Sequence, residues 1–144
     1  MTSSLSRVLL VLASAAALAG CTTAPPPSLY TRLGGKPAID LVVNDFVDRN
    51  ASHPRTKRTF EGVKLPPLKV LIADQICEAA GGPCVYKGDS MKLSHKGLGI
   101  TTDEFNGLVD NLVGAMTQAG VGAREQQEVL SVLGPMAKDI VEKP

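Results

Sequence analysis

The 144-residue sequence predicts an all-α protein. Three observations lead to this class. Apolar residues recur three and four positions apart, a spacing that places them on one face of a helix. No segment shows the regular alternation of apolar and polar residues that is typical of a strand. Thr101 and Glu104 have the spacing of a capping box, in which two side chains bond backbone N–H groups at the start of a helix.

The first long helix begins near Pro37, because proline suits the first turn of a helix. Short helical turns are expected on either side of this helix, at residues 28–33 and 55–60. The second long helix opens at Pro66 and ends at Gly81. The apolar faces are Ile39, Val42, Val43, Phe46 and Val47 in the first helix, and Leu68, Leu71, Ile72 and Ile76 in the second.

Two further long helices follow a short helical turn at residues 89–95. Thr101 caps the first of them, which continues to Gly120, and Ile100 is placed to pack onto Phe105 across the cap. The last helix is expected over about residues 123–141. The inward positions are Phe105, Leu108, Val109, Leu112, Val113 and Met116 in the third helix, and Val129, Val132, Leu133, Met136 and Ile140 in the last.

Residues 1–20 have the features of a lipoprotein signal peptide. Arg7 supplies a positive charge, and the apolar run after it is too short for a comfortable membrane span. The Leu-Ala-Gly-Cys segment that ends at Cys21 resembles a bacterial lipobox, which implies lipid attachment at Cys21 and cleavage before it. The alternative is an ordinary signal peptide followed by a chance cysteine. Thr22 after the cysteine favours delivery to the outer membrane, facing the periplasm.

Residues 21–27 are expected to form a tether, and residues 28–144 a single domain. The prolines at 25–27 favour an extended polyproline backbone. One of the 15 basic residues, Arg7, lies in the signal peptide, so 14 basic residues remain against 14 acidic ones. This balance argues against nucleic-acid binding and leaves membrane attachment to the lipid.

Cys77 and Cys84 remain as a pair once Cys21 carries a lipid. They flank the break that follows the second long helix, so the chain can fold back and bring them together. A disulfide that closes so short a loop contributes about 2–3 kcal/mol of stability. Two free thiols are one alternative, and a weak metal site is another, although the spacing is typical of no zinc motif.

His95 is the candidate metal ligand. It ends the predicted turn at 89–95 and is one of only two histidines in the chain. The other, His53, lies in a polar turn between helices and is expected to be exposed. The domain also has only five aromatic residues, so few large rings fill its core. A flat apolar cofactor would complete such a core, although aliphatic side chains alone also fill helical cores.

Four segments occur in a characteristic order and spacing: Ser28–Gly35, Phe60–Val63, Gly81–Gly88 with its Gly-Gly-Pro and Tyr86, and Met91-x-x-x-His95-x-Gly-Leu-Gly-Ile-Thr101. Together they resemble the group I truncated haemoglobins over essentially the whole predicted domain. The resemblance implies a truncated globin-like two-over-two helical sandwich that binds haem b, with His95 as the proximal iron ligand. The sequence has no Cys-x-x-Cys-His motif for covalent haem attachment.

The resemblance also implies which side chains surround the haem. Phe60 would pack against the porphyrin, and Tyr86 and Lys92 would reach a propionate, although Lys92 suits a solvated surface charge equally well. The remaining implied positions are Leu68, Ile72, Met91, Phe105 and Leu112 at the haem, and Phe46, Val47 and Ile76 in the distal pocket.

The distal side departs from many truncated haemoglobins. Val47 stands where they carry a tyrosine, and Leu68 and Ile72 stand where they often carry polar residues. Thr59 is the one nearby donor. Gln75, one turn further along, is expected to face outward beside Asp74, with an inward orientation as the alternative. A hydrogen bond to bound dioxygen is worth about 1–3 kcal/mol. Its absence favours carbon monoxide or nitric oxide as ligand, or an open iron position.

The sequence leaves three functions open. The first is an envelope-anchored globin that binds a diatomic gas, O2, NO or CO. The second is a periplasmic haem redox enzyme acting on nitric oxide or peroxide, which requires an electron donor that the sequence does not identify. The third is a haem-free helical lipoprotein that serves as an interaction module. The intact segment around His95 favours the first.

Overall fold

The computed structural model describes residues 25–144. The predicted signal peptide and the predicted lipidation site at Cys21 lie outside these residues. Within residues 25–144 the chain is helical, as the sequence predicts, and no strand occurs; the only β-type pairing there is an isolated bridge between Thr101 and Lys143. None of the described helices is both long enough and apolar enough to cross a membrane.

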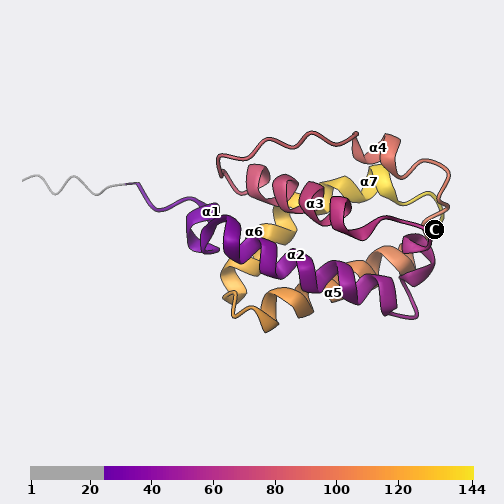
Figure 1. Ribbon diagram of the computed structural model, residues 1–144, viewed down its shortest axis with the longest axis horizontal. Helices are drawn as coiled ribbons and strands as arrows, with labels where there is room; N and C mark the ends of the chain where they lie inside the picture. The colour runs from indigo at the N-terminus through magenta and orange to yellow at the C-terminus, as the bar shows by residue number, and fades with distance from the viewer. Residues whose placement is uncertain (1–24) are drawn as a thin grey trace, which may run out of the picture.

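Four long helices and several short ones make up this part of the chain (Figure 1). The elements are α1 (Leu29–Arg32), α2 (Gly35–Ser52), η1 (Lys57–Phe60), α3 (Leu65–Ala79), α4 (Met91–Ser94), α5 (Thr102–Gln118), α6 (Ala123–Leu133), η2 (Gly134–Met136) and α7 (Ala137–Ile140).

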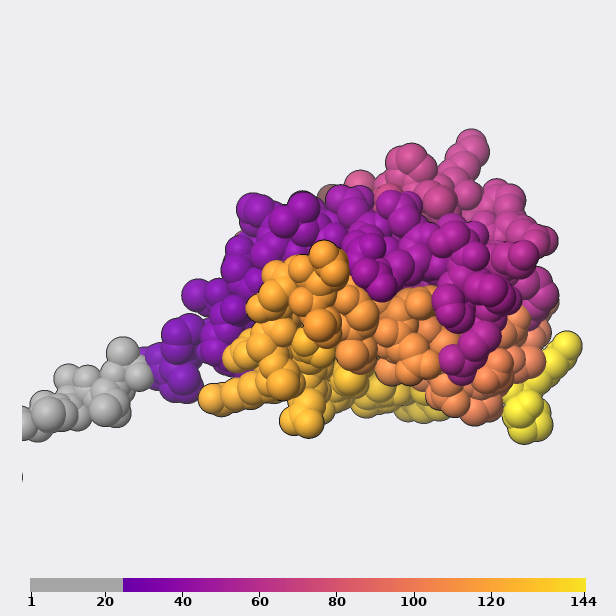
Figure 2. Space-filling model, turned by 90° about the horizontal axis from the view of Figure 1, so that it is seen from below, coloured from indigo at the N-terminus to yellow at the C-terminus, as the bar shows by residue number. Residues whose placement is uncertain are grey.

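Helix α2 lies at the centre of the fold, because it packs against both α3 and α5. Helix α6 contacts α1 and α3, and α4 lies beside α7. In Figure 1, α1 and α4 stand at opposite ends of the molecule. Figure 2 likewise shows the C-terminal residues, in yellow, at the end opposite the first described residues, in indigo.

The helix starts follow local sequence signals. The Ser28 hydroxyl accepts a hydrogen bond from the Thr31 N–H and caps α1. At α5 the capping box forms in full, because the Thr101 hydroxyl accepts from the Glu104 N–H (3.2 Å) and the Glu104 carboxylate accepts from the Thr101 N–H (2.9 Å). These bonds satisfy N–H groups that have no partner inside the helix.

The last predicted helix is broken. The structure divides residues 123–141 into α6, the 3₁₀ turn η2 and α7. Pro135 explains the break, because it lacks a backbone N–H and its ring crowds the preceding turn. Within α6, Val129 is buried as expected, whereas Val132, also expected to point inward, is 40% exposed.

The core is mainly aliphatic, with one buried polar link. The Asn111 side chain on α5 donates to the Asn50 side chain on α2 (3.0 Å), and the Asn50 amide donates to the Phe46 carbonyl (2.8 Å). The Thr56 hydroxyl donates to the Asn50 carbonyl (2.8 Å), so the turn that leads into η1 is held by the same link. Because each of these buried polar groups has a hydrogen-bond partner, placing them in the core costs little stability.

A disulfide joins Cys77 near the end of α3 to Cys84 in the following loop, with the two Cα atoms 5.7 Å apart. This is the pairing that the sequence favours over free thiols. It fastens α3 to the loop of residues 81–90, which leads into α4.

Candidate functional site

His95 follows the last residue of α4 and is half-buried. Its Nδ1 atom lies 2.8 Å from the Met91 carbonyl oxygen and 3.0 Å from the Ser94 hydroxyl. A carbonyl oxygen only accepts hydrogen bonds, so Nδ1 carries the proton and donates it. The lone pair is therefore on Nε2, for which the described residues provide no hydrogen-bond donor. This is the arrangement of a metal-binding imidazole whose other nitrogen is oriented by a carbonyl.

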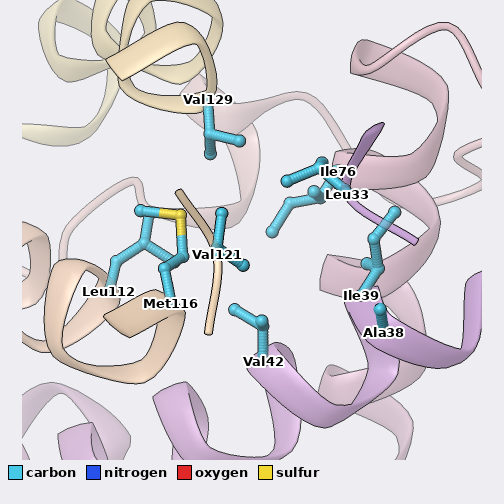
Figure 3. A pocket seen from close by; sticks show the side chains of 9 residues that line it. All are labelled: Leu33, Ala38, Ile39, Val42, Ile76, Leu112, Met116, Val121 and Val129. Carbon is cyan, nitrogen blue, oxygen red and sulfur yellow. The ribbon is translucent and has the colours of Figure 1, made fainter. Parts of the chain in front are cut away.

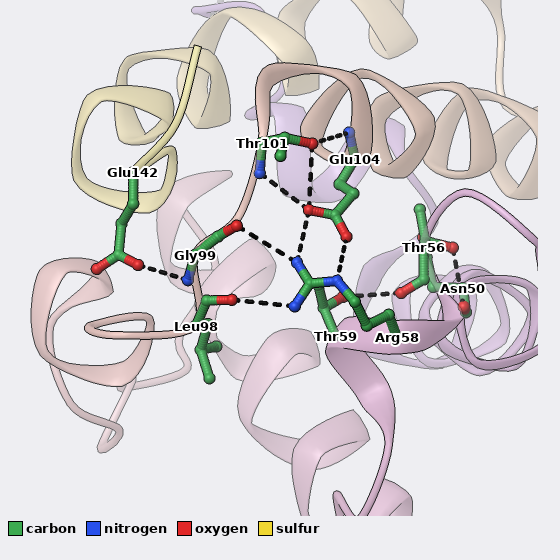
Figure 4. Close-up of polar contacts among 9 residues, drawn as sticks. All are labelled: Asn50, Thr56, Arg58, Thr59, Leu98, Gly99, Thr101, Glu104 and Glu142. Carbon is green, nitrogen blue, oxygen red and sulfur yellow. Dashed lines mark hydrogen bonds and ion pairs between the residues drawn. The ribbon is translucent and has the colours of Figure 1, made fainter.

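The loop after His95 is held from two sides (Figure 4). On one side, the Glu142 carboxylate accepts hydrogen bonds from the N–H groups of Gly97 and Gly99, each at 2.6 Å. On the other side, the Arg58 guanidinium donates to the carbonyls of Leu98 (3.2 Å) and Gly99 (3.3 Å). Residues from η1 and from the C-terminal segment thus fix the backbone that follows the candidate ligand.

The ion pair at Arg58 links η1 to the start of α5. Its guanidinium donates to both carboxylate oxygens of Glu104, each at 2.7 Å. The hydrogen bond from Arg58, followed by the bonds from Thr101, lowers the pKa of Glu104 to about 2, against an opposing effect of burial. Glu142 also has a lowered pKa, chiefly because of the backbone N–H groups of Gly97 and Gly99. Both carboxylates are therefore ionised at neutral pH.

The predicted haem-contacting and distal residues fall into two groups. The first group, Phe46, Val47, Ile76 and Leu112, is buried in the core between α2, α3 and α5. The second group, Phe60, Leu68 and Ile72, is half-buried and packs against that core. Met91 and Phe105 are also half-buried but do not belong to this cluster.

Large apolar side chains near His95 are left partly accessible. Leu98, three residues after His95, is 42% exposed, and Leu93 on α4 is 60% exposed. Phe60 and Phe105, two of the few aromatic residues, are not fully buried either. Apolar surface of this kind is most stable when another apolar body covers it. Leu93 and Leu98 therefore leave apolar surface close to His95 in the chain, which a flat apolar group would bury.

The surroundings of Tyr86 and Lys92, the two residues predicted to reach a propionate, do not indicate that role. The Tyr86 hydroxyl donates to the Asp89 carbonyl (2.8 Å), within its own loop. Burial, and then the charge of Asp89, raises the pKa of Tyr86. Lys92 is exposed and forms no ion pair with any described residue. Lys92 thus has the surroundings of a solvated surface charge.

The inward position of Gln75 corrects a sequence-based expectation. Gln75 was expected to face outward, but it is half-buried, and its amide nitrogen lies 3.5 Å from the Met91 sulfur and 3.6 Å from the Met136 sulfur. Helix α3 therefore turns one polar side chain towards α4 and η2. The signal was present in the sequence, because Gln75 follows Ile72 by three residues and so shares its face.

Two other polar groups are engaged in turns. The Thr59 hydroxyl donates to the Thr56 carbonyl (2.8 Å), which occupies the one donor expected near the distal pocket. His53, expected to be exposed, is half-buried as the C-cap of α2, and its Nδ1 accepts from the Arg55 N–H (3.3 Å). His53 therefore supports a turn, and His95 is the better candidate ligand.

An apolar hollow lies deeper in the fold (Figure 3). It does not include His95. It adjoins the predicted haem surroundings through Ile76 on α3 and Leu112 on α5, and every side chain lining it is apolar. The lining residues are Leu33, Ala38, Ile39, Val42, Ile76, Leu112, Met116, Val121 and Val129.

Comparison with known proteins identifies the family. The model of the bacterial-like globin family matches residues 28–142, nearly all of the described chain. The chain belongs to the bacterial-like globin family. A group 1 truncated hemoglobin from Mycolicibacterium paratuberculosis is 35% identical to this globin over 123 residues, which cover 85% of this chain and 90% of the relative. A group 1 truncated hemoglobin from Synechocystis is 30% identical over 114 residues, covering 76% and 92%.

Solved structures place the globin in the same fold. The truncated hemoglobin from Tetrahymena pyriformis superposes with a TM-score of 0.76 at 26% identity, covering 80% of this chain and 98% of that one. The 2/2 hemoglobin from Synechococcus, solved with covalently attached heme, gives a TM-score of 0.74 at 28% identity, covering 80% and 98%. The two-over-two helical fold expected from the sequence is therefore confirmed.

Proposed function

We propose that this globin binds haem b through Nε2 of His95 and holds a diatomic gas at the opposite face of the iron. The observation that carries the proposal is the hydrogen bond from His95 Nδ1 to the Met91 carbonyl, which leaves Nε2 free as a ligand. When bound, haem would supply an iron with one position open to O2, NO or CO.

The metal chemistry of the described residues supports a haem rather than a bare ion. No group of three or more His, Cys, Asp or Glu side chains within residues 25–144 is placed to hold a metal. A protein site for a free transition metal usually needs three or four ligands. Haem iron already has four porphyrin nitrogens, so a single imidazole suffices. Cys77 and Cys84 are joined to each other, which leaves neither for a thioether bond and favours b-type haem.

The apolar distal residues suggest which gas is preferred. Val47, Leu68 and Ile72 have no hydrogen-bond donors, and the Thr59 hydroxyl is engaged by a backbone carbonyl. The Gln75 amide, on the same face of α3 as Ile72, is directed to the sulfur atoms of Met91 and Met136. A ligand that depends on a donated hydrogen bond is therefore held less well than a neutral one such as CO or NO. The apolar hollow behind Ile76 and Leu112 also suits a small uncharged molecule.

The envelope location is also part of the proposal, through a lipid on Cys21. The base of the tether is fixed to the domain, because Arg32 donates to the Pro27 carbonyl (2.8 Å) and pairs with Glu125 and Glu128 on α6. A lipid-anchored globin would therefore be held at its α1 end (Figure 1). We expect Cys21→Ala to release or mislocalise the domain without changing its absorption spectrum. A changed spectrum would contradict a purely anchoring role.

The central test is an absorption spectrum of the protein expressed with haem available. A Soret band that disappears in His95→Ala and persists in His53→Ala would support the proposal. A protein without a Soret band, or a band unchanged by His95→Ala, would overturn it and favour the haem-free interaction lipoprotein. Mixing the ferrous protein with nitric oxide, oxygen and a chemical reductant separates binding from turnover. Catalytic consumption of nitric oxide would favour the redox enzyme.

A further inference from the structure

The helix that presents His95 is too short to orient it alone. Helix α4 has four residues, and His95 follows the last of them as the C-cap. A single helical turn has little cooperative stability of its own in water. The orientation of the imidazole must therefore depend on what holds the chain on either side of α4.

The chain after His95 makes a turn that depends on glycine. Gly97 and Gly99 have φ angles of 79° and 58°, in the left-handed region that other residues rarely adopt. In this conformation both N–H groups point to the same carboxylate, that of Glu142, at 2.6 Å each. One side chain thus satisfies two backbone donors of the turn, with one oxygen for each.

The backbone around Glu142 strengthens the same attachment. The N–H groups of Glu142 and Lys143 both donate to the Ile100 carbonyl, at 2.9 and 3.1 Å, and the Thr102 N–H donates to the Lys143 carbonyl at 3.0 Å. The C-terminal segment therefore forms hydrogen bonds with N–H groups and with one carbonyl of the chain after His95. Arg58, which lies on η1, donates to two further carbonyls of the same turn.

We propose that Glu142 is a positioning residue for His95, fixing the backbone after the imidazole so that Nε2 meets the haem iron in one orientation. The inference rests on the proposed function, since it concerns haem iron. Glu142 acts through Gly97 and Gly99 and does not touch the cofactor. An exposed ion pair usually adds little to stability. The Glu142 carboxylate instead accepts two hydrogen bonds from backbone N–H groups, and bonds to a charged acceptor are stronger than those between neutral groups.

The test compares Glu142→Gln with Asp139→Asn. The glutamine amide has one oxygen acceptor, and its nitrogen opposes an N–H donor, so at least one of the two bonds is lost. Asp139 is exposed on α7, three residues before Glu142, and forms no hydrogen bond or ion pair with the described residues, so its variant removes the same charge without touching the turn.

Two readouts report the orientation of the ligand. The first is the iron–histidine stretching band of the ferrous protein, measured by resonance Raman spectroscopy. The second is the rate of ferric haem transfer to excess apomyoglobin. We expect Glu142→Gln to broaden or shift the band and to speed haem loss about tenfold, the effect of losing one charge-assisted hydrogen bond. Asp139→Asn should match the wild type in both.

A third measurement does not need haem. In the apoprotein, amide hydrogen exchange at residues 95–100 should be faster in Glu142→Gln than in Asp139→Asn at the same pH. Equal exchange, or an unchanged band and haem-loss rate in Glu142→Gln, would overturn the positioning role. A wild-type protein that takes up no haem would instead overturn the proposed function, so the two failures are distinguishable.

Discussion

The two sides of the proposed haem site are built differently. The His95 side consists of a one-turn helix and a loop, yet polar contacts from Glu142, Arg58 and Met91 hold it. The opposite side consists of the long helices α2 and α3, and it presents aliphatic side chains such as Leu68 and Ile72. The weakly structured side thus needs directional bonds, whereas the long helices are held by packing.

This difference separates two properties of the globin. The polar contacts on the His95 side specify how a cofactor is held. The aliphatic side specifies little about the gas, because apolar contacts lack the directional donors that distinguish one diatomic molecule from another. Experiments on the two sides should therefore affect different measurements.

The largest expected effect concerns the covalent link between the two sides. Replacing both Cys77 and Cys84 with alanine should lower the free energy of unfolding by about 2–3 kcal/mol, because the loop from α3 to α4 gains freedom in the unfolded state. Chemical denaturation of the oxidised apoprotein and of the double variant measures this. Wild type treated with dithiothreitol is the control and should behave like the variant. Equal stability of all three would mean that the link is dispensable.

The next effect concerns the polar contacts on the His95 side, and its size depends on pH. Glu104→Gln should lower stability by about 1–2 kcal/mol at pH 7, because it removes the negative charge and one of the two oxygens that accept from Arg58, while a glutamine at this position still completes the capping box. The exposed part of the ion pair is discounted for solvent screening. The pKa of Glu104 is about 2 in the fold, against 4.5 for an unperturbed glutamate. The stabilisation is therefore complete above pH 4.5 and is lost as the pH falls towards 2.

Denaturation curves of wild type and Glu104→Gln at several pH values test this pH dependence. The difference between their free energies of unfolding should shrink as the pH falls towards 2. Asp103→Asn, on the same turn of α5, provides a comparison at an exposed carboxylate. A gap that stayed constant down to pH 2 would show that the ionised form of Glu104 is not what stabilises the fold.

A smaller effect is expected when a hydrogen-bond donor is added at an aliphatic position of the distal side. Ile72→Gln places an amide on the half-buried face of α3, and one added hydrogen bond should slow oxygen release about tenfold. The release rate of carbon monoxide should change less. Ile72→Leu controls for altered packing. An equal change for both gases in Ile72→Gln would indicate that access, rather than hydrogen bonding, had changed.

The smallest effect is expected at Lys92. Because its side chain is exposed, Lys92→Gln should change the rate of haem loss by no more than about fivefold, corresponding to an exposed ion pair of at most about 1 kcal/mol. The haem-transfer assay measures this rate, with Lys96→Gln, at an exposed lysine just after α4, as a control. A much faster loss in Lys92→Gln alone would establish a propionate contact that the surroundings of Lys92 do not suggest.

Local sequence was sufficient to predict most helices and to single out His95 as the candidate ligand. The capping box of Thr101 and Glu104 spans three residues, and helical periodicity spans three or four, so both depend on neighbours in the chain. The break at Pro135 was also local, but the apolar spacing through Val132 and Met136 concealed it. The face occupied by Gln75 followed from its spacing to Ile72, although its polarity suggested exposure.

The contacts that hold His95 in place required the tertiary structure. Glu142 lies 45 positions after Gly97, and Arg58 lies 46 positions before Glu104, so no short-range pattern links either pair. Such partners are selected by how the helices pack, which brings the C-terminal segment and η1 to the same turn. The sequence by itself determined the helices, the family resemblance and the candidate ligand, because these depend on short-range spacing. Only the tertiary structure decided what orients that ligand, because hydrogen bonds over such separations exist only once the chain has folded.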